Sequence, residues 1–240
     1  MKFICSNLRR AMAGRWFCAA VFTSSALLWL SIGPETWYFF DGLLDKNTPD
    51  WTSFLQNALI GQTGQLLMPA LSALPYSAEA FREIRNGIFR PVLFRVGYRN
   101  YLIGQTVACF VSGAMVQLGA MAILCVFLSV AVVVTGNVPI SLSYISAIAF
   151  LLLGRMVCGG GWALSGCIAA LITSTASAAM IAPLCLNYAL TMIATRFFSQ
   201  MRMLDPSTWQ SAPMGALLLA ALALLTITGA VLYREVKKHV

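Results

Sequence analysis

The amino-acid sequence predicts an all-α protein that crosses a membrane several times, and three observations support this prediction. The 240 residues are 59% hydrophobic and 10% charged, whereas soluble proteins are typically about 25% charged. The charges are clustered, so that 55 consecutive uncharged residues run from 100 to 154 and another 40 from 156 to 195. At about 20 residues per span, these two runs alone hold four spans. Finally, Lys and Arg gather in alternate segments, as they do in polytopic membrane proteins. These features exclude soluble enzymes, nucleic-acid-binding proteins and secreted disulfide scaffolds.

The first half of the chain predicts two spans. The apolar run 16–33 follows four basic residues, and we expect a retained span, because the run is long for a cleaved signal peptide. The aromatic-rich segment 34–52 has a net charge of −3, which is typical of an external loop at the membrane surface. A second span is expected over residues 53–76. The segment 77–100, with a net charge of +3, then indicates a cytoplasmic loop.

The second half predicts four more spans. The third begins near Tyr101 and ends before the turn-forming residues 135–139. A fourth helix that stopped at Arg155 would be about 20 Å long, too short to cross, so we expect residues 141–172 to form one span with Arg155 inside it. A polar turn at 173–177 leads to a fifth span over 178–195. The sixth is expected over 213–233.

The basic residues orient this layout. Twelve Lys and Arg lie at the N-terminus, in the central loop and at the C-terminus, whereas three lie in the predicted outer segments. The sequence thus predicts six transmembrane helices with both termini in the cytoplasm. We expect residues 1–240 to form a single transmembrane domain, with an interfacial N-terminal helix over 1–15, a cytoplasmic loop over 77–100 and an outer re-entrant segment over 196–212.

Residues 77–90 have the pattern of a short amphipathic helix between spans 2 and 3. Phe81, Ile84 and Ile88 share one side of a helical wheel. The opposite side carries Glu79, Glu83, Asn86 and Arg90. Ser77 is suited to cap the helix, and Gly87 with Pro91 to end it. Such a helix either lies on the lipid surface or docks against a cytoplasmic protein, and the wheel favours neither.

The order of several short motifs resembles the membrane subunit of type 2 ABC transporters, in particular bacterial lantibiotic-immunity and drug-export permeases of similar length. The likeness covers essentially the whole chain. It is carried by a basic N-terminal segment, a Pro-Tyr-Ser turn, a Gly-Ile-Phe-Arg-Pro run, a Tyr-Leu-Ile-Gly-Gln run and an Asp-Pro-Ser-Thr-Trp segment, which are residues 7–11, 73–77, 87–95, 101–105 and 204–209.

This resemblance implies an exporter subunit of the bacterial plasma membrane. The amphipathic helix would be the coupling helix that contacts a separately encoded ABC ATPase subunit, through Glu79, Phe81, Arg82, Glu83, Arg85, Asn86 and Arg90. The outer segment would help to close an external gate, with Asp205, Pro206 and Trp209 as its residues. Two permease subunits, identical or homologous, would form the path for an amphipathic peptide, a lipid or a hydrophobic drug, and the ATPase dimer would bind ATP and Mg²⁺.

Arg155 matches no motif of that family. A charged residue inside a span costs at least about 2.5 kcal/mol by insertion scales, so it needs a cavity or a partner. Arg155 could line the translocation path for an anionic headgroup or a peptide carboxylate, bond the backbone of Gly159, Gly160 and Gly161, or extend its side chain toward the cytoplasm. The glycines themselves are expected to allow close packing between spans.

The chain shows no sign of catalysis or of its own energy source. It has no GxxxxGK[ST] motif, and its one histidine is His239, so we expect a non-enzymatic subunit without a cofactor of its own. The seven cysteines include no CxxC pair and indicate neither a disulfide framework nor a metal site. Two alternatives stay open: a secondary transporter or channel without an ATPase, and a structural or sensory subunit that transports nothing.

Overall fold

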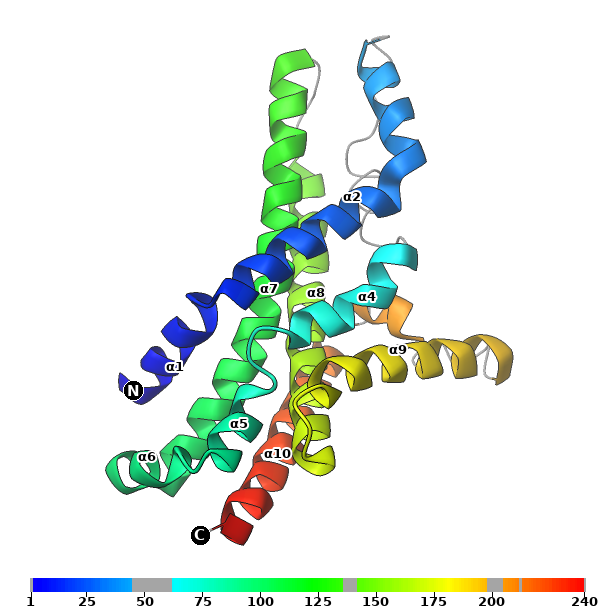
Figure 1. Cartoon of the computed structure of the whole chain (residues 1–240). Coiled ribbons are helices and arrows are strands. Elements are labelled where there is room, and N and C mark those ends of the chain that lie inside the picture. Colours follow the sequence, from blue (N-terminus) through cyan, green and yellow to red (C-terminus); the bar gives the residue numbers. More distant parts are fainter. Residues whose placement is uncertain (1, 45–61, 136–141, 198–204, 212, 240) are drawn as a thin grey trace.

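The computed structural model describes residues 2–44, 62–135, 142–197, 205–211 and 213–239. Over these residues all regular elements are helices (Figure 1). In chain order they are α1 (Lys2–Met12), α2 (Arg15–Leu44), α4 (Gln62–Ala73), α5 (Glu79–Arg85), α6 (Phe89–Val96), α7 (Tyr98–Thr135), α8 (Leu142–Thr173), α9 (Ala178–Phe197), the 3-10 helix η2 (Pro206–Ser211) and α10 (Met214–His239). The long helices α7 and α8 run along each other, and α2, α9 and α10 pack on this pair.

Four of the described helices are long and apolar enough to cross a membrane: Tyr98–Phe127, Ala149–Thr173, Ala178–Phe197 and Met214–Lys238. They correspond to the predicted spans 3 to 6. The pair Phe3–Met12 and Arg15–Leu30, bent by 54°, gives a fifth if it is counted as one span. The described part of the chain is therefore that of a multi-pass membrane protein with four to five candidate spans.

The first nine residues of the predicted second span, 53–61, lie outside the described residues. Its described part consists of α4, a helix of 12 residues that at 1.5 Å per residue is about 18 Å long, and the start of the turn that follows it. That length is short of a bilayer core of about 30 Å.

The prediction that Arg155 lies inside a helix is confirmed. Helix α8 continues without a break for 32 residues from Leu142 to Thr173. The chain then turns where the polar run predicts a turn, with Ser174 at a φ of 55°, and α9 begins at Ala178.

The segment predicted as an external loop from residue 34 begins as a helix, because α2 continues through Pro34 to Leu44. A proline removes one hydrogen bond and bends a helix. It does not end the helix here, where an apolar aromatic run follows it. Figure 1 shows that α2 changes direction along its length.

Small residues let the helices approach closely, as the sequence predicts. A Cβ atom at Gly113 would lie 2.6 Å from the carbonyl oxygen of Gly159, and a Cβ at Gly166 would lie 2.3 Å from that of Ala179. A Cβ at Gly160 would clash with the ring of Phe110, at 2.4 Å. Helix α7 thus meets α8, and α8 meets α9, through backbone contacts that only glycine permits.

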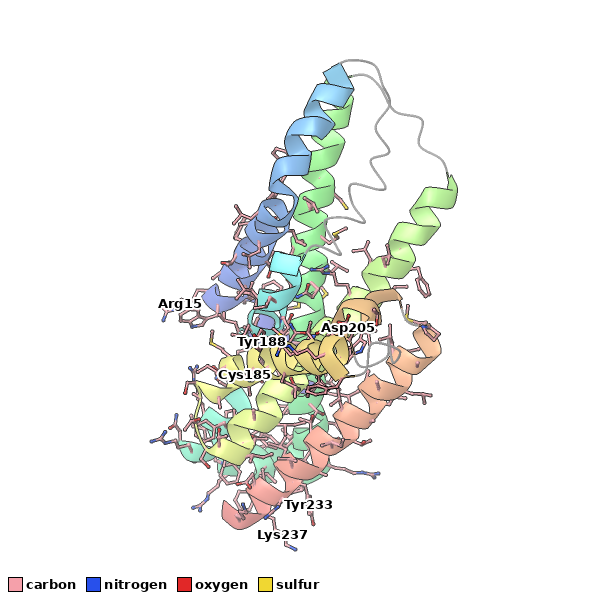
Figure 2. All side chains as sticks on the ribbon, turned by 90° about the vertical axis from the view of Figure 1, so that its right-hand side faces the viewer. Arg15, Cys185, Tyr188, Asp205, Tyr233 and Lys237 are labelled. Atoms are coloured by element: carbon pink, nitrogen blue, oxygen red, sulfur yellow. The ribbon has the colours of Figure 1, made fainter. Side chains whose placement is uncertain are left out.

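The three basic segments gather at one end of the molecule. Figure 1 shows α1, α5, α6 and the last turns of α10 in its lower part. Figure 2 shows Tyr233 and Lys237 at that same end, whereas Asp205 lies well away from it. A buried cluster that includes Tyr76, Phe81, Phe89, Tyr101 and Leu232 fills this end, so α5 belongs to the folded core.

Candidate functional site

The start of α5 is fixed by a contact with α8. The predicted cap, Ser77, does not cap the helix. Its Oγ donates a hydrogen bond of 2.8 Å to the carbonyl oxygen of Ala163 and lies 3.7 Å from Cys109 Sγ, and Ala78 takes the cap position without a side-chain bond. Ser77 therefore joins the turn before α5 to the two central helices.

The helical wheel is right for two apolar residues and wrong for two others. Phe81 and Ile84 are buried, as predicted, but Glu83 is buried too, at 6% exposure, and Ile88 is 50% exposed. The reason for Ile88 is that α5 ends at Arg85 and Gly87 adopts a φ of +69°. That left-handed conformation favours glycine and turns the chain before Ile88 is reached.

Glu83 is buried because three side chains from other elements bond its carboxylate. Arg10 Nη1 of α1 lies 2.8 Å from Oε1. The hydroxyl of Tyr101, 3.1 Å away, and the amide nitrogen of Gln105 both donate to Oε2. Burial raises the pKa of Glu83 above its ordinary value of 4.5, and the Arg10 charge opposes this rise.

Arg10 bonds a second carboxylate of α5. Its Nη2 lies 3.1 Å from Glu79 Oε2, and Arg82 Nη1 lies 3.2 Å from the other oxygen of Glu79. Desolvation lowers the pKa of Arg10, but the Glu79 and Glu83 carboxylates outweigh it and raise that pKa overall. We call Arg10, Glu79, Glu83, Tyr101 and Gln105 the Glu83 cluster. It joins α1, α5 and α7.

The seven residues proposed for ATPase contact divide into two groups. Arg82, Arg85, Asn86 and Arg90 are exposed, and Glu79 is partly exposed. Phe81 and Glu83 face the interior of the chain. The accessible face of this segment is thus basic, because the cluster takes up its acidic side chains.

A second short helix, α6, follows directly, which the sequence analysis missed. Pro91 was expected to end a helix but is the third residue of α6, where no intrahelical N–H bond is needed. Phe89 anchors α6 in the core, while Phe94 is 92% exposed. Gly97, at a φ of +82°, ends it.

Arg155 is buried at 5% exposure and is oriented by a chain of hydrogen bonds. Its Nε donates to Gln117 Oε1 at 3.1 Å, Gln117 Nε2 donates to Ser72 Oγ, and Ser72 Oγ donates to the carbonyl oxygen of Met68 at 2.8 Å. We call Arg155, Gln117 and Ser72 the Arg155 network. It joins α8, α7 and α4.

The Arg155 network borders a cavity of about 40 Å³. Five elements meet there, since the lining includes Pro69, Gln117, Arg155, Asn187 and Pro206. Asn187 is itself buried. The cavity thus has polar groups from three helices in the interior of the bundle.

Of the residues proposed for an outer gate, Pro206 and Trp209 belong to η2 and Asp205 directly precedes it. Both the backbone N–H and the hydroxyl of Thr208 donate to the carbonyl oxygen of Asp205, at 3.0 and 2.9 Å. Trp209 stacks on Trp162 of α8, with ring centroids 5.5 Å apart and planes 16° apart, and Pro206 lines the cavity beside Arg155. Pro206 and Trp209 therefore lie close to the cavity that Arg155 lines. The sequence analysis treated the outer segment and Arg155 as separate features.

Sequence reasoning missed Ser72, Gln105, Gln117 and Asn187. A signal for them exists, because each is a polar side chain inside or beside an apolar run, where polar groups are expected to face a partner or a cavity. Gln105 bonds Glu83 from 22 positions away, Gln117 bonds Arg155 from 38, and Ser72 bonds Gln117 from 45. Helical periodicity does not reveal such distant partners.

The chain matches no known protein-family model, and no curated protein matches it either.

Proposed function

We propose that the chain is the membrane-spanning subunit of an ATP-driven exporter, a permease of the type 2 ABC class that works with a separately encoded ATPase. Two such subunits, identical or homologous, would enclose a path for an amphipathic peptide, a lipid or a hydrophobic drug in a bacterial plasma membrane. The subunit performs no chemistry itself, and its partner binds ATP and Mg²⁺.

The observation that carries this proposal is the way α5 is held. Seven residues are too few for a stable isolated helix, yet α5 has two apolar anchors, a bonded carboxylate and a polar tie to α8. A force on its exposed face therefore reaches α1, α7 and α8 directly. A subunit without a nucleotide-binding motif of its own requires such a mechanical link to the ATPase.

The chemistry of the exposed face specifies the partner surface. Arg82, Arg85 and Arg90 are exposed, so we expect an acidic groove on the ATPase. A hollow of about 270 Å³ beside α5, lined by Pro75, Glu79 and Arg82 among others, gives room for a partner side chain. Phe81 and Glu83 act on the inner side, where they hold the helix in place.

Charge reversal on the exposed face tests this assignment. The full chain is purified in mild detergent together with the ATPase that binds it, which is identified by its GxxxxGK[ST] motif. The affinity of the two proteins and the ATP hydrolysis of their complex are then measured. In the double variant Arg82→Glu and Arg85→Glu, we expect association to weaken about tenfold or more, because the acidic groove would repel the new carboxylates.

The matched control makes the same charge change elsewhere. Arg95→Glu with Arg99→Glu alters two exposed arginines outside α5, so it should leave association within about twofold. An equal loss of ATPase association in both double variants would show that general electrostatic attraction, and not a specific contact with α5, holds the two proteins together. Substrate movement by the reconstituted chain without any ATPase would contradict the proposal and favour a secondary transporter or channel.

A further inference from the structure

An open hollow of about 270 Å³ lies where α6, α7 and α10 meet. It is lined by Leu93, Tyr98, Tyr233 and Lys237, and we call it the Lys237 hollow. The Tyr98 hydroxyl donates to the carbonyl oxygen of Tyr233 at 2.8 Å, and the two rings meet edge to face with centroids 5.2 Å apart. Two helices thus hold one aromatic wall of the hollow in place. Figure 2 shows Tyr233 and Lys237 near the C-terminal end of α10.

Helix α10 places the Lys237 hollow at the surface of the membrane. The helix carries no charge from Met214 to Tyr233, a stretch of about 20 residues that is about 30 Å long at 1.5 Å per residue. That length matches the hydrocarbon core of a bilayer. The first charged residue of α10 is Arg234, so Tyr233 lies where the acyl chains give way to the headgroups. Tyrosine is typical of that layer.

Helix α6 supports the same depth independently. Phe94, which follows Leu93 in this helix, is 92% exposed. Gly97 then connects α6 directly to the candidate span that begins at Tyr98. A large aromatic side chain with this exposure is unfavourable in water, but it suits a short amphipathic helix at the boundary between lipid and water. Both helices therefore place the hollow at the level of the lipid headgroups.

The hollow carries positive charge that the surrounding helices do not neutralise. Lys237 makes no ion pair and no side-chain hydrogen bond with any described residue, in contrast to the next residue, Lys238, which pairs with Glu235. Glu235 is the only acidic residue in the sequences of α6, α7 and α10. The exposed residues Arg99 and Arg234 directly follow the two tyrosines of the aromatic wall. The occupant that this hollow favours is therefore an anion.

We propose that the Lys237 hollow binds the headgroup of a phospholipid with a net negative charge, such as phosphatidylglycerol. The ammonium of Lys237 pairs with the phosphate, since lysine binds phosphate as a point charge, and Tyr233 can add a hydroxyl donor. A zwitterionic headgroup brings an ammonium of its own, which the basic surroundings repel. This lipid site is independent of the export function proposed above.

A titration of the isolated chain with lipid tests the site. The full chain in mild detergent is titrated with phosphatidylglycerol and, separately, with phosphatidylcholine of the same acyl chains. Native mass spectrometry gives the dissociation constant of the first bound lipid. We expect phosphatidylglycerol to bind at least about fivefold more tightly, because that is the contribution of one basic side chain at a membrane surface to the affinity for an anionic lipid.

Two neighbouring lysines provide a matched pair of variants. Lys237→Gln should weaken phosphatidylglycerol binding about fivefold and leave phosphatidylcholine binding unchanged. Lys237→Arg keeps the charge and should keep the preference. Lys238→Gln removes the same charge one position along, from a side chain outside the lining, and should leave phosphatidylglycerol binding within about twofold. Circular dichroism checks that all variants keep the native helical content.

Three results would overturn the lipid site. Equal affinity of the native chain for the two lipids would remove the charge preference. Equal weakening in Lys237→Gln and Lys238→Gln would show that the net charge of the chain, and not the hollow, attracts the lipid. Binding of glycerol phosphate as tightly as phosphatidylglycerol would assign the hollow to a soluble phosphate compound.

Addition of the ATPase separates the lipid site from a protein contact. We expect the chain to keep its bound phosphatidylglycerol, because the proposed ATPase contact lies on α5. Displacement of the lipid by the ATPase would assign the hollow to that protein and reject the lipid site. A chain that binds phosphatidylglycerol but no ATPase keeps the site, and only the export proposal fails.

Discussion

Glu83 is the residue whose burial most changes the interpretation of the α5 segment. The sequence places it on a solvent-facing side, but the side chain lies inside, bonded by Arg10 and Tyr101. In the folded protein its pKa is raised above 4.5. A carboxyl group with a raised pKa disfavours the folded state once it becomes charged, so Glu83 makes the end of the bundle sensitive to pH.

The pH dependence of unfolding tests this effect. Between pH 4.5 and the raised pKa, Glu83 is charged in the unfolded chain and protonated in the folded one. Stability should therefore fall as pH increases through this window, by at most about 1.4 kcal/mol per pH unit, and then level off. Thermal unfolding from pH 4.5 upward should show this fall in the native chain and not in Glu83→Gln. A fall of equal size in both would assign it to other groups.

Gln117 orients Arg155, so we expect removal of the Gln117 amide to lower the stability of the folded chain. In Gln117→Leu, Arg155 Nε loses the acceptor seen at 3.1 Å in a buried place, for which we expect a loss of about 1–3 kcal/mol. Gln117→Glu supplies an opposite charge at the same position and should recover most of this loss. The measurement is the free energy of unfolding of the three chains under one set of conditions. Equal stability of the Leu and Glu variants would contradict the role assigned to Gln117.

At the scale of elements, close contact at glycines positions α7 against α8. A Cβ at Gly113 would approach the Gly159 carbonyl to 2.6 Å, so Gly113→Ala should cost about 1–3 kcal/mol through displaced backbone. Gly229→Ala is the matched control, because a Cβ there meets nothing within 4 Å and alanine favours the helix. We therefore expect the free energy of unfolding to fall in Gly113→Ala and to stay equal or rise slightly in Gly229→Ala, relative to the native chain. Equal effects would contradict the packing argument.

The sequence predicts the apolar helices far better than it predicts the contacts of the polar segment. The last four spans and the position of Arg155 follow from hydropathy and from the minimum length of a span. The bounds of α2 and the orientation of α5 do not, because local signals such as Pro34 and the wheel position of Glu83 are overridden by neighbours. Arg10 lies 73 positions from Glu83, and no periodicity encodes that pairing. The cavity beside Arg155 has the same character, since five elements build it.

At the scale of the molecule, the gathering of basic segments predicts which positions face the cytoplasm. In a chain whose native cysteines are replaced by serine, single cysteines at Arg85, Lys237 and Gly136 are labelled in intact cells with a membrane-impermeant maleimide. We expect label only at Gly136, between α7 and α8, and label at Arg85 and Lys237 only after lysis. Labelling of Arg85→Cys from outside intact cells would reverse the layout, and the export proposal would fall with it.

The two ion pairs of Arg10 couple the movement of α1 to that of α5. Both carboxylates that Arg10 bonds belong to α5, so α5 cannot tilt and leave residues 2–12 behind without breaking these pairs. Any displacement of α5 would therefore also move α1, and a bulky domain fused ahead of Lys2 would load this moving part directly.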